Sequence, residues 1–263
     1  MKKILTIAGS DPSGGAGIQA DIKTIAAHGM YAMSVITALT AQNTTGVFAV
    51  REEAPDFVAR QMDAVFTDIF PDAVKIGMVS NADLIRVIAE RLRFYKARNI
   101  VTDPVMAATS GGKLMADGAA GTLIKELFPI SRVVTPNLME SETLCGLQIS
   151  DENDMISAAG TIAGPHGCAV LVKGGHSEYG TSDLLYDGGE IQWIRGERIE
   201  NRNTHGTGCT LSSAIACRLA EGRPLAESVR LAKEYVTGAI AAMLDIGAGR
   251  GPLDHGWRLR SEK

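Results

Sequence analysis

Residues 203–210 are of types that could bind an anion and move a proton. They have the sequence Asn-Thr-His-Gly-Thr-Gly-Cys-Thr and run into small residues with helical spacing. Gly206 and Gly208 let the backbone approach an anion closely, and the following helix directs unpaired N–H groups and its positive end to the same place. Because that field favours a thiolate, Cys209 could accept a proton at neutral pH. A glycine-rich turn before a core helix is the structural alternative.

The hydrophobic pattern predicts the elements that position this segment. Apolar, β-branched runs predict strands at residues 3–8, 32–39, 73–76, 100–102, 132–135 and 169–172. Helical periodicity is found at residues 15–29, 55–69, 81–97, 116–127, 137–145, 151–164, 207–221 and 224–244, and a hairpin is expected over residues 183–194. The alternation predicts one domain over residues 1–263, with a three-layer α/β/α fold whose mainly parallel central sheet has an antiparallel edge.

Composition argues against several other classes of protein. The chain has 263 residues, a net charge of −4 and four cysteines without a C-x-x-C pair. This acidic balance disfavours nucleic acid or an anionic membrane as a general partner and favours a small molecule. The spacing suggests neither a structural zinc site nor a disulfide framework. No secretory or membrane segment is predicted, so we expect a cytoplasmic protein.

Ligands of open α/β sheets bind outside the carboxyl ends of the strands. The residues that follow the predicted strands are 9–17, 40–43, 77–78, 103–106, 136–140 and 173–176. Residues 15–20 formally match a dinucleotide-binding pattern, which would make the protein an NAD-binding oxidoreductase. That pattern needs an acidic residue at the end of the second strand, where this chain has Thr40-Ala41-Gln42. No G-x-x-x-x-G-K-[ST] motif is present, which argues against a P-loop ATPase.

A series of spaced motifs resembles a known family. The motifs lie at residues 8–21, 40–44, 75–78, 103–106, 135–140, 172–176 and 204–209. Together they are similar to the hydroxymethylpyrimidine and phosphomethylpyrimidine kinases of thiamine biosynthesis, in the ribokinase-like superfamily. The resemblance implies a ribokinase-like fold and transfer of the ATP γ-phosphoryl group to a substrate hydroxymethyl group, followed by a second phosphorylation at the same site. It also implies ATP, Mg²⁺ and a homodimer.

The resemblance also implies a catalytic group at the anion-binding segment. Phosphoryl transfer needs in-line positioning and compensation of charge. The residues that would supply the anion hole are Gly206, Thr207, Gly208 and Cys209. Cys209 would be the base, at the position where many sugar kinases of the superfamily carry an aspartate.

The resemblance also implies that carboxylates and a lysine at other strand ends bind the nucleotide. Asp103 and Glu140 could orient a hydrated Mg²⁺, and Asn137, Glu140 and Lys173 would face the ATP phosphates. The structural alternatives are a turn residue at Asp103, a capping box between Asn137 and Glu140, and a solvated lysine at Lys173.

Gln42 is the candidate for recognition of the pyrimidine. An aminopyrimidine presents an acceptor nitrogen beside an NH₂ donor, and a primary amide can match both. By resemblance, the pocket around Gln42 is formed by Gly9, Ala16, Asp21, Met78 and Val105. The alternatives are core packing for Met78 and Val105 and an exposed helix position for Asp21. His176 and His205 are left out, because single histidines are more often structural.

Two other functions stay open. Related kinases of this fold phosphorylate pyridoxal, a similar flat heterocycle, although Gln42 and Met78 favour the pyrimidine. A pyrimidine-binding module without turnover is the second alternative, and the intact anion-hole glycines argue against it. Residues 43–47 and 107–113 contain Gly, Ser or Thr and are expected to close over the cleft.

Overall fold

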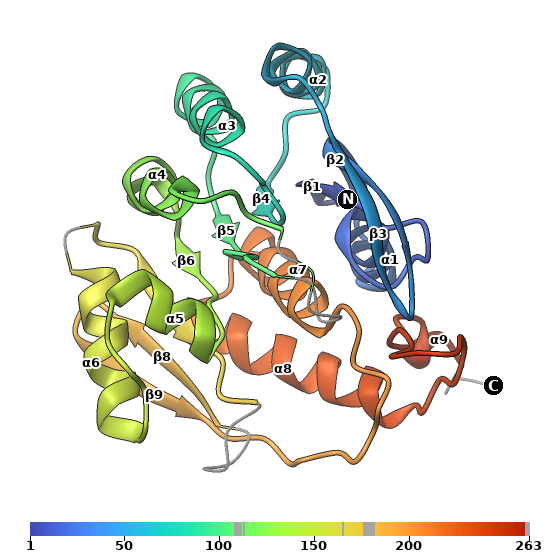
Figure 1. Ribbon diagram of the computed structural model, residues 1–263, viewed down its shortest axis with the longest axis vertical. Coiled ribbons are helices and arrows are strands. Elements are labelled where there is room, and N and C mark those ends of the chain that lie inside the picture. Colours follow the sequence, from blue (N-terminus) through green and yellow to red (C-terminus); the bar gives the residue numbers. More distant parts are fainter. Residues whose placement is uncertain (108–111, 113, 165, 176–181, 261–263) are drawn as a thin grey trace.

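Helices cover both faces of a central sheet (Figure 1). The computed structural model describes residues 1–107, 112, 114–164, 166–175 and 182–260, and over these residues the sheet has nine strands. The strands are β1 (Lys3–Ser10), β2 (Tyr31–Asn43), β3 (Gly46–Glu52), β4 (Ala73–Ile76), β5 (Ile100–Thr102), β6 (Val133–Val134), β7 (Ala169–Val172), β8 (Asp183–Asp187) and β9 (Glu190–Ile194). Their order is β3-β2-β1-β4-β5-β6-β7-β8-β9.

The sheet is parallel in its middle and antiparallel at both edges. β2, β1, β4, β5, β6 and β7 run parallel, and β8 and β9 form the expected hairpin. The prediction of one antiparallel edge was incomplete, because β2 extends beyond residue 39 and pairs antiparallel with β3. β3 is mostly exposed, so no buried alternating face marks it in the sequence. Residues 43–47 are the tip of this hairpin, and most of residues 107–113 lie outside the described part of the chain.

Two layers of helices pack on the sheet (Figure 1). One face is covered by α2 (Pro55–Asp68), α3 (Ala82–Phe94), α4 (Ala119–Glu126) and α6 (Glu152–Ala163), and the other by α1 (Gly17–Ala27), α7 (Thr207–Ala220) and α8 (Leu225–Ala241). The remaining helical segments are α5 (Leu138–Cys145), a 3-10 turn (Phe128–Ile130) and α9 (Trp257–Arg260). The three-layer fold expected from the sequence is confirmed. None of the described helices is long and apolar enough to cross a membrane.

α7 connects the core to the carboxyl end of the sheet. Most of its residues are buried, and it packs on α1, α8 and the strands β1, β4 and β5. Small side chains such as Ser213, Ala214 and Ala216 allow this close approach. The hydroxyl of Ser212 lies 3.4 Å from a carboxylate oxygen of Asp103, just after β5. The N-terminal part of α7 is therefore held where the strands end.

Candidate active site

The start of α7 and the loop after β1 pack backbone against backbone. Gly206, the residue before α7, has a φ of +83°, and a Cβ there would lie 1.8 Å from the carbonyl oxygen of Gly15. Only glycine tolerates both conditions. Gly206 also has no side chain with which to cap α7. The N–H of Thr207 donates to the carbonyl oxygen of Thr204 at 3.3 Å, so the N–H groups of Gly208 and Cys209 are the ones that could bind an anion. The predicted anion-binding segment thus forms a helix N-terminus at the strand ends.

Asp103 and Lys173 form an ion pair beside this helix N-terminus. Nζ of Lys173 lies 2.9 Å from Oδ1 of Asp103, and the two side chains are 16% and 2% exposed. Thr135 donates to the same oxygen at 3.1 Å. A Cβ at Gly208 would lie 3.3 Å from Lys173 Nζ and 3.4 Å from Asp103 Oδ2. Lys173 is therefore not a freely solvated lysine, and it lies next to the predicted anion hole.

Glu140 adds a second carboxylate near Lys173. Its Oε2 accepts from the N–H of Asn137 at 2.8 Å, and Asn137 Oδ1 accepts from the N–H of Glu140 at 2.8 Å. The capping box considered as an alternative is thus present at the start of α5. The pKa of Glu140 is raised by burial, lowered by Lys173 and raised by Asp103, with a net increase.

The charges of this cluster fit a divalent cation. Two buried carboxylates, Asp103 and Glu140, share the single ammonium group of Lys173. Such an excess of negative charge suits a hydrated Mg²⁺, which needs only one or two protein carboxylates. Within the described residues, no group of three or more His, Cys, Asp or Glu side chains could hold a metal alone. ATP phosphates and water would have to complete such a site.

A second ion pair, Asp21–Lys75, is sealed beneath the cleft. Lys75 Nζ lies 2.9 and 2.8 Å from the two oxygens of Asp21, and both side chains are 0% exposed. Thr6 on β1 and Ser213 on α7 donate to the same carboxylate. The exposed position considered for Asp21 is therefore wrong, because its side chain is 0% exposed and all its polar contacts described above are to buried protein groups.

Lys75 was missed by the sequence analysis. It lies inside β4, and its side chain points toward the layer of α1 and α7. Burial lowers its pKa, but the charge of Asp21 more than compensates and the net change is upward. Its place in the motif at residues 75–78 was the signal that could have drawn attention to it.

Cys209 is within electrostatic reach of both ion pairs. The residue is partly exposed, yet its thiol is surrounded closely enough that burial raises its pKa to about 11. Lys75 lowers this pKa, whereas Asp21 and Asp103 raise it. The expectation that the helix field would favour the thiolate at neutral pH is wrong for this arrangement. Burial raises the pKa more than Lys75 lowers it, and the two carboxylates add to the increase.

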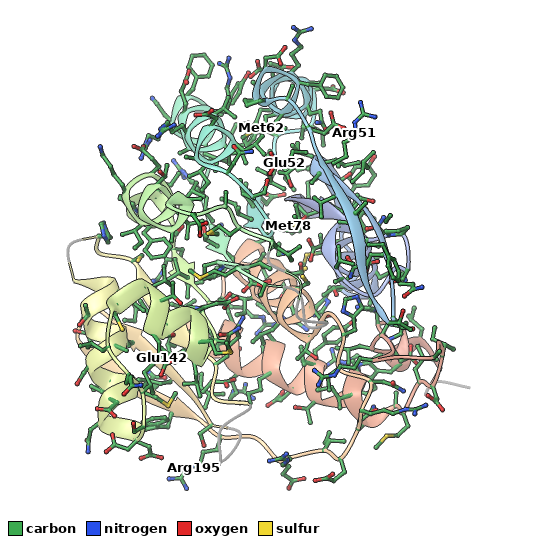
Figure 2. The ribbon with its side chains drawn as sticks, viewed as in Figure 1. Arg51, Glu52, Met62, Met78, Glu142 and Arg195 are labelled. Atoms are coloured by element: carbon green, nitrogen blue, oxygen red, sulfur yellow. The ribbon has the colours of Figure 1, made fainter. Side chains whose placement is uncertain are left out.

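The residues predicted to form the pyrimidine pocket come from the ends of β1, β4 and β5. A Cβ at Gly9 would lie 3.0 Å from Sδ of Met78, so these two residues touch. Met78 is 8% exposed and lies in the interior of the molecule (Figure 2). Ala16 immediately precedes α1, and Val105 is half-buried in the segment after β5. Met78 is packed, as its alternative expected, and still borders the glycine at the end of β1.

Gln42 contacts a histidine that the sequence analysis had left out. Nε2 of His205 lies 3.3 Å from Nε2 of Gln42 and 2.8 Å from Oδ2 of Asp11. Burial raises the pKa of Asp11, but hydrogen bonds from His205, Ser13 and Ala16 bring it down to about 2. His205 directly precedes the glycines of the anion-binding segment, and this adjacency was the signal available in the sequence. His176 lies outside the described residues.

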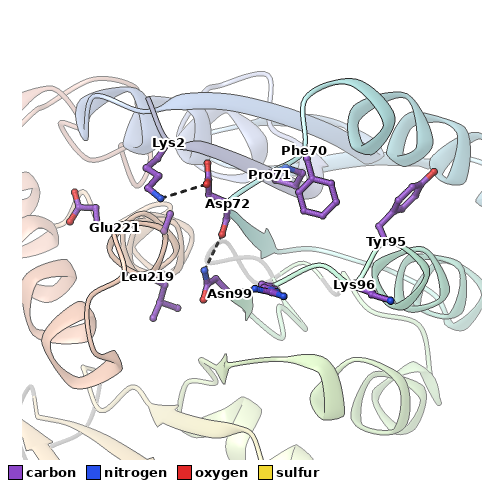
Figure 3. Close-up of a pocket in the computed structure, with 12 residues that line it drawn as sticks. Lys2, Phe70, Pro71, Asp72, Tyr95, Lys96, Asn99, Leu219 and Glu221 are labelled. Atoms are coloured by element: carbon purple, nitrogen blue, oxygen red, sulfur yellow. Dashed lines mark hydrogen bonds and ion pairs between the residues drawn. The ribbon is translucent and has the colours of Figure 1, made fainter.

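A separate cavity of about 560 Å³ lies at the amino ends of the central strands, away from the candidate site (Figure 3). Lys2 and Asn99 both contact Asp72 there, at the amino ends of β1, β4 and β5. α3 and α7 end next to this cavity, so their negative ends face it. Its described lining contains none of the predicted site residues. The helix field therefore favours an anion at the carboxyl ends of the strands, where α7 begins.

Comparison with solved structures identifies the class of protein. The pyridoxal kinase from Staphylococcus aureus in complex with ADP matches this structure with a TM-score of 0.91 and 35% sequence identity, covering 99% of this chain and 95% of that one. The fold, with a helix N-terminus and paired charges at the strand ends, is that of a ribokinase-like kinase.

The chain belongs to the phosphomethylpyrimidine kinase family, whose model matches residues 11–254. The hydroxymethylpyrimidine/phosphomethylpyrimidine kinase of Rhizobium meliloti is 52% identical over 255 residues, which are 95% of this chain and 96% of the relative. The thiamine biosynthesis bifunctional protein ThiED of Geobacter sulfurreducens is 49% identical over 96% of this chain. The chain spans only about half, 52%, of that longer relative.

Proposed function

We propose that this protein transfers the γ-phosphoryl group of ATP to the hydroxymethyl group of 4-amino-5-hydroxymethyl-2-methylpyrimidine and then phosphorylates the monophosphate. The observation that carries this proposal is that three features meet at the carboxyl ends of the strands. The first turn of α7 offers N–H groups to a phosphoryl group, Lys173 offers a positive charge beside them, and Gln42 offers an amide to an aminopyrimidine.

The phosphate side of the site works by positioning and charge compensation. Asp103 and Glu140 would hold Mg²⁺, which neutralises phosphate charge when bound. Lys173 exchanges part of its contact with Asp103 for ATP phosphate oxygens, and Asn137 keeps Glu140 in place through the capping box. Backbone N–H groups at the start of α7 bind the phosphoryl group during its transfer. The segment that supplies them is Gly206, Thr207, Gly208 and Cys209.

Cys209 accepts the proton that leaves the substrate hydroxyl. The O–H bond breaks and its proton moves to the Sγ thiolate. The substrate oxygen bonds to the γ-phosphorus while the bond from that phosphorus to the bridging oxygen breaks and ADP leaves. With a pKa of about 11, only a small fraction of the thiol is ionised at neutral pH, so the thiolate is scarce but strongly basic. A base that takes the proton only after the bond to phosphorus has largely formed is sufficient, because phosphoryl transfer depends mainly on positioning and electrostatics. Lys75 favours the thiolate from below.

The pyrimidine side is formed by Gln42 with Gly9, Ala16, Met78 and Val105, while Asp21 supports it.

The working unit is a single domain that assembles into a homodimer in the cytoplasm. The exposed Phe48 and Val50 on the outer strand β3 supply an apolar edge for such an assembly. Sedimentation velocity tests the dimer, and a monomer at all concentrations would remove it.

Mass spectrometry after incubation with Mg-ATP tests the reaction, with pyridoxal as a parallel substrate. A mono- and then a diphosphorylated pyrimidine are expected. If pyridoxal is clearly the better substrate, pyridoxal kinase replaces the proposal, a candidate favoured by the similarity to the S. aureus enzyme. Binding of the pyrimidine without any turnover would leave a binding module. Cys209→Ala is the matched control, and we expect it to lower turnover by about 10²–10⁴-fold while retaining pyrimidine binding.

A further inference from the structure

Asp11 determines which ring nitrogen of His205 carries a hydrogen. The carboxyl group is 3% exposed and accepts from the N–H and hydroxyl of Ser13 at 2.9 and 2.7 Å and from the N–H of Ala16 at 2.9 Å. These donors favour the ionised carboxylate, which can only accept hydrogen bonds. Nε2 of His205 lies 2.8 Å from Oδ2 of Asp11 and must therefore carry a hydrogen.

Thr40 is the second neighbour of the Gln42 amide, and its own hydrogen bond limits the role that it can play toward that amide. The single hydroxyl hydrogen of Thr40 is donated to the carbonyl oxygen of Ser10 at 2.9 Å. The hydroxyl oxygen also lies 3.3 Å from Oε1 of Gln42. Because its hydrogen is used in the shorter bond, Thr40 can act toward Gln42 only as an acceptor.

Both neighbours call for the same orientation of the Gln42 amide. The one Nε2–H of His205 is donated mainly to Asp11, so this nitrogen has no lone pair for Nε2 of Gln42, which is itself a donor. Thr40 presents a lone pair to Oε1 of Gln42, which is itself an acceptor. The oxygen and nitrogen of an amide are close in size, so a half-turn about the last side-chain bond needs no extra space. After it, Oε1 faces the Nε2–H of His205, which it shares with Asp11, and Nε2 donates to Thr40. One lone pair and one N–H of the amide remain for a ligand.

We propose that His205, held as a donor by Asp11, and Thr40 together fix the Gln42 amide in this orientation and thereby select heterocycles with an amino group next to a ring nitrogen. Such an edge donates one hydrogen bond and accepts one, which matches what the amide has left. Pyridoxal has no amino group beside its ring nitrogen. His205 is thus a positioning residue that acts through Gln42. This role rests on the proposed function, because it assigns the specificity of the same site.

A double-mutant cycle on the full chain tests this role. Titration calorimetry measures the dissociation constant of the aminopyrimidine for the unmodified protein, His205→Leu, Gln42→Ala and the double variant. His205→Leu should weaken binding about tenfold, Gln42→Ala at least as much, and the second change should add little to the first. His205→Gln, whose NH₂ group can donate to both neighbours, should retain most of the affinity.

Kinetics supply a second readout that a merely structural role would not change. The ratio of kcat/KM for the aminopyrimidine to that for pyridoxal should fall in His205→Leu, while KM for ATP stays unchanged. Equal aminopyrimidine affinity in His205→Leu and the unmodified protein, or additive losses in the double variant, would overturn the inference and leave the kinase activity standing. If His205→Leu does not fold, Thr40→Val must lower affinity and selectivity for the inference to hold. Coupled losses in a protein that phosphorylates neither compound would support the role of His205 and remove the proposed reaction.

Discussion

Two lysine–aspartate pairs lie near the first turn of α7, and they differ in their access to the cleft. In the Asp21–Lys75 pair both side chains are 0% exposed, and a threonine and a serine bind the same carboxylate. In the Asp103–Lys173 pair, Lys173 keeps 16% of its side-chain surface exposed. The lysine of the sealed pair can contact only its aspartate, because no ligand reaches it. The lysine of the open pair can exchange its aspartate for a phosphate group. We therefore propose that the same two residue types stabilise the structure below the cleft and compensate phosphate charge within it.

Loss of the lysine from the sealed pair should have the largest effect. Lys75→Met leaves the Asp21 carboxylate buried without its counter-ion, so the free energy of unfolding should fall by about 3–5 kcal/mol in chemical denaturation. The double variant Asp21→Asn/Lys75→Met removes both charges and should recover most of the loss. A Lys75→Met protein of unchanged stability would show that the two pairs do not differ in this way.

Loss of the lysine from the open pair should act mainly on turnover. Lys173→Met removes the positive charge that, in the proposed mechanism, stabilises the phosphoryl group during its transfer, and we expect kcat to fall by about 10²–10³-fold. The stability loss should be smaller than for Lys75→Met, because water reaches this pair more easily. Steady-state kinetics with ATP check the prediction. A change in KM for ATP alone would restrict Lys173 to ground-state binding.

Gly208 lies against the open pair and provides a steric test of it. In Gly208→Ala the new methyl group would contact both Lys173 and Asp103, and kcat/KM should fall by up to about 10²-fold. Thermal stability should not decrease, because alanine favours a helix over glycine. Gly121→Ala in α4 is the matched control, since nothing lies within 4 Å of its Cβ position. Equal activity of both variants would place the phosphate elsewhere.

The pH dependence of Cys209 reports on the two pairs together. Its pKa is raised to about 11, so the thiolate fraction should increase about tenfold per pH unit between about pH 7 and pH 10. Alkylation by iodoacetamide, followed by peptide mass spectrometry, should accelerate accordingly. Cys145, which is partly exposed, serves as an internal control for accessibility. Rapid alkylation of Cys209 at neutral pH would contradict the raised pKa.

Residues at strand ends were more predictable than residues inside elements. Asp103 and Lys173 directly follow short apolar runs, and parallel strands bring such positions to one edge of the sheet. Lys75 lies within a strand and Asp21 within a helix, so their pairing follows from how α1 and α7 pack on the sheet. Sequence spacing does not describe that packing.

One strand was missed and one pKa was misjudged, because both depend on competing effects. The outer strand β3 lacks a buried face, so tertiary pairing with β2 forms it without a hydrophobic pattern of its own. The pKa of Cys209 depends on the balance of helix field, burial and neighbouring charge. A motif shows that the thiol lies at a helix N-terminus, but it does not show how deeply the thiol is buried or which carboxylates surround it.

The contacts that complete the site join distant parts of the chain. Asp11 and His205 are 194 residues apart in sequence, and Asp21 and Ser213 are 192 residues apart. During synthesis at about 5–20 residues per second, β1 therefore waits roughly 10–40 s for α7 to cover it. A partly made chain exposes one face of its growing sheet during that interval and has no anion-binding loop. The protein becomes competent for catalysis only late in its own translation, and a ribosome that stalls before α7 leaves a chain prone to aggregation.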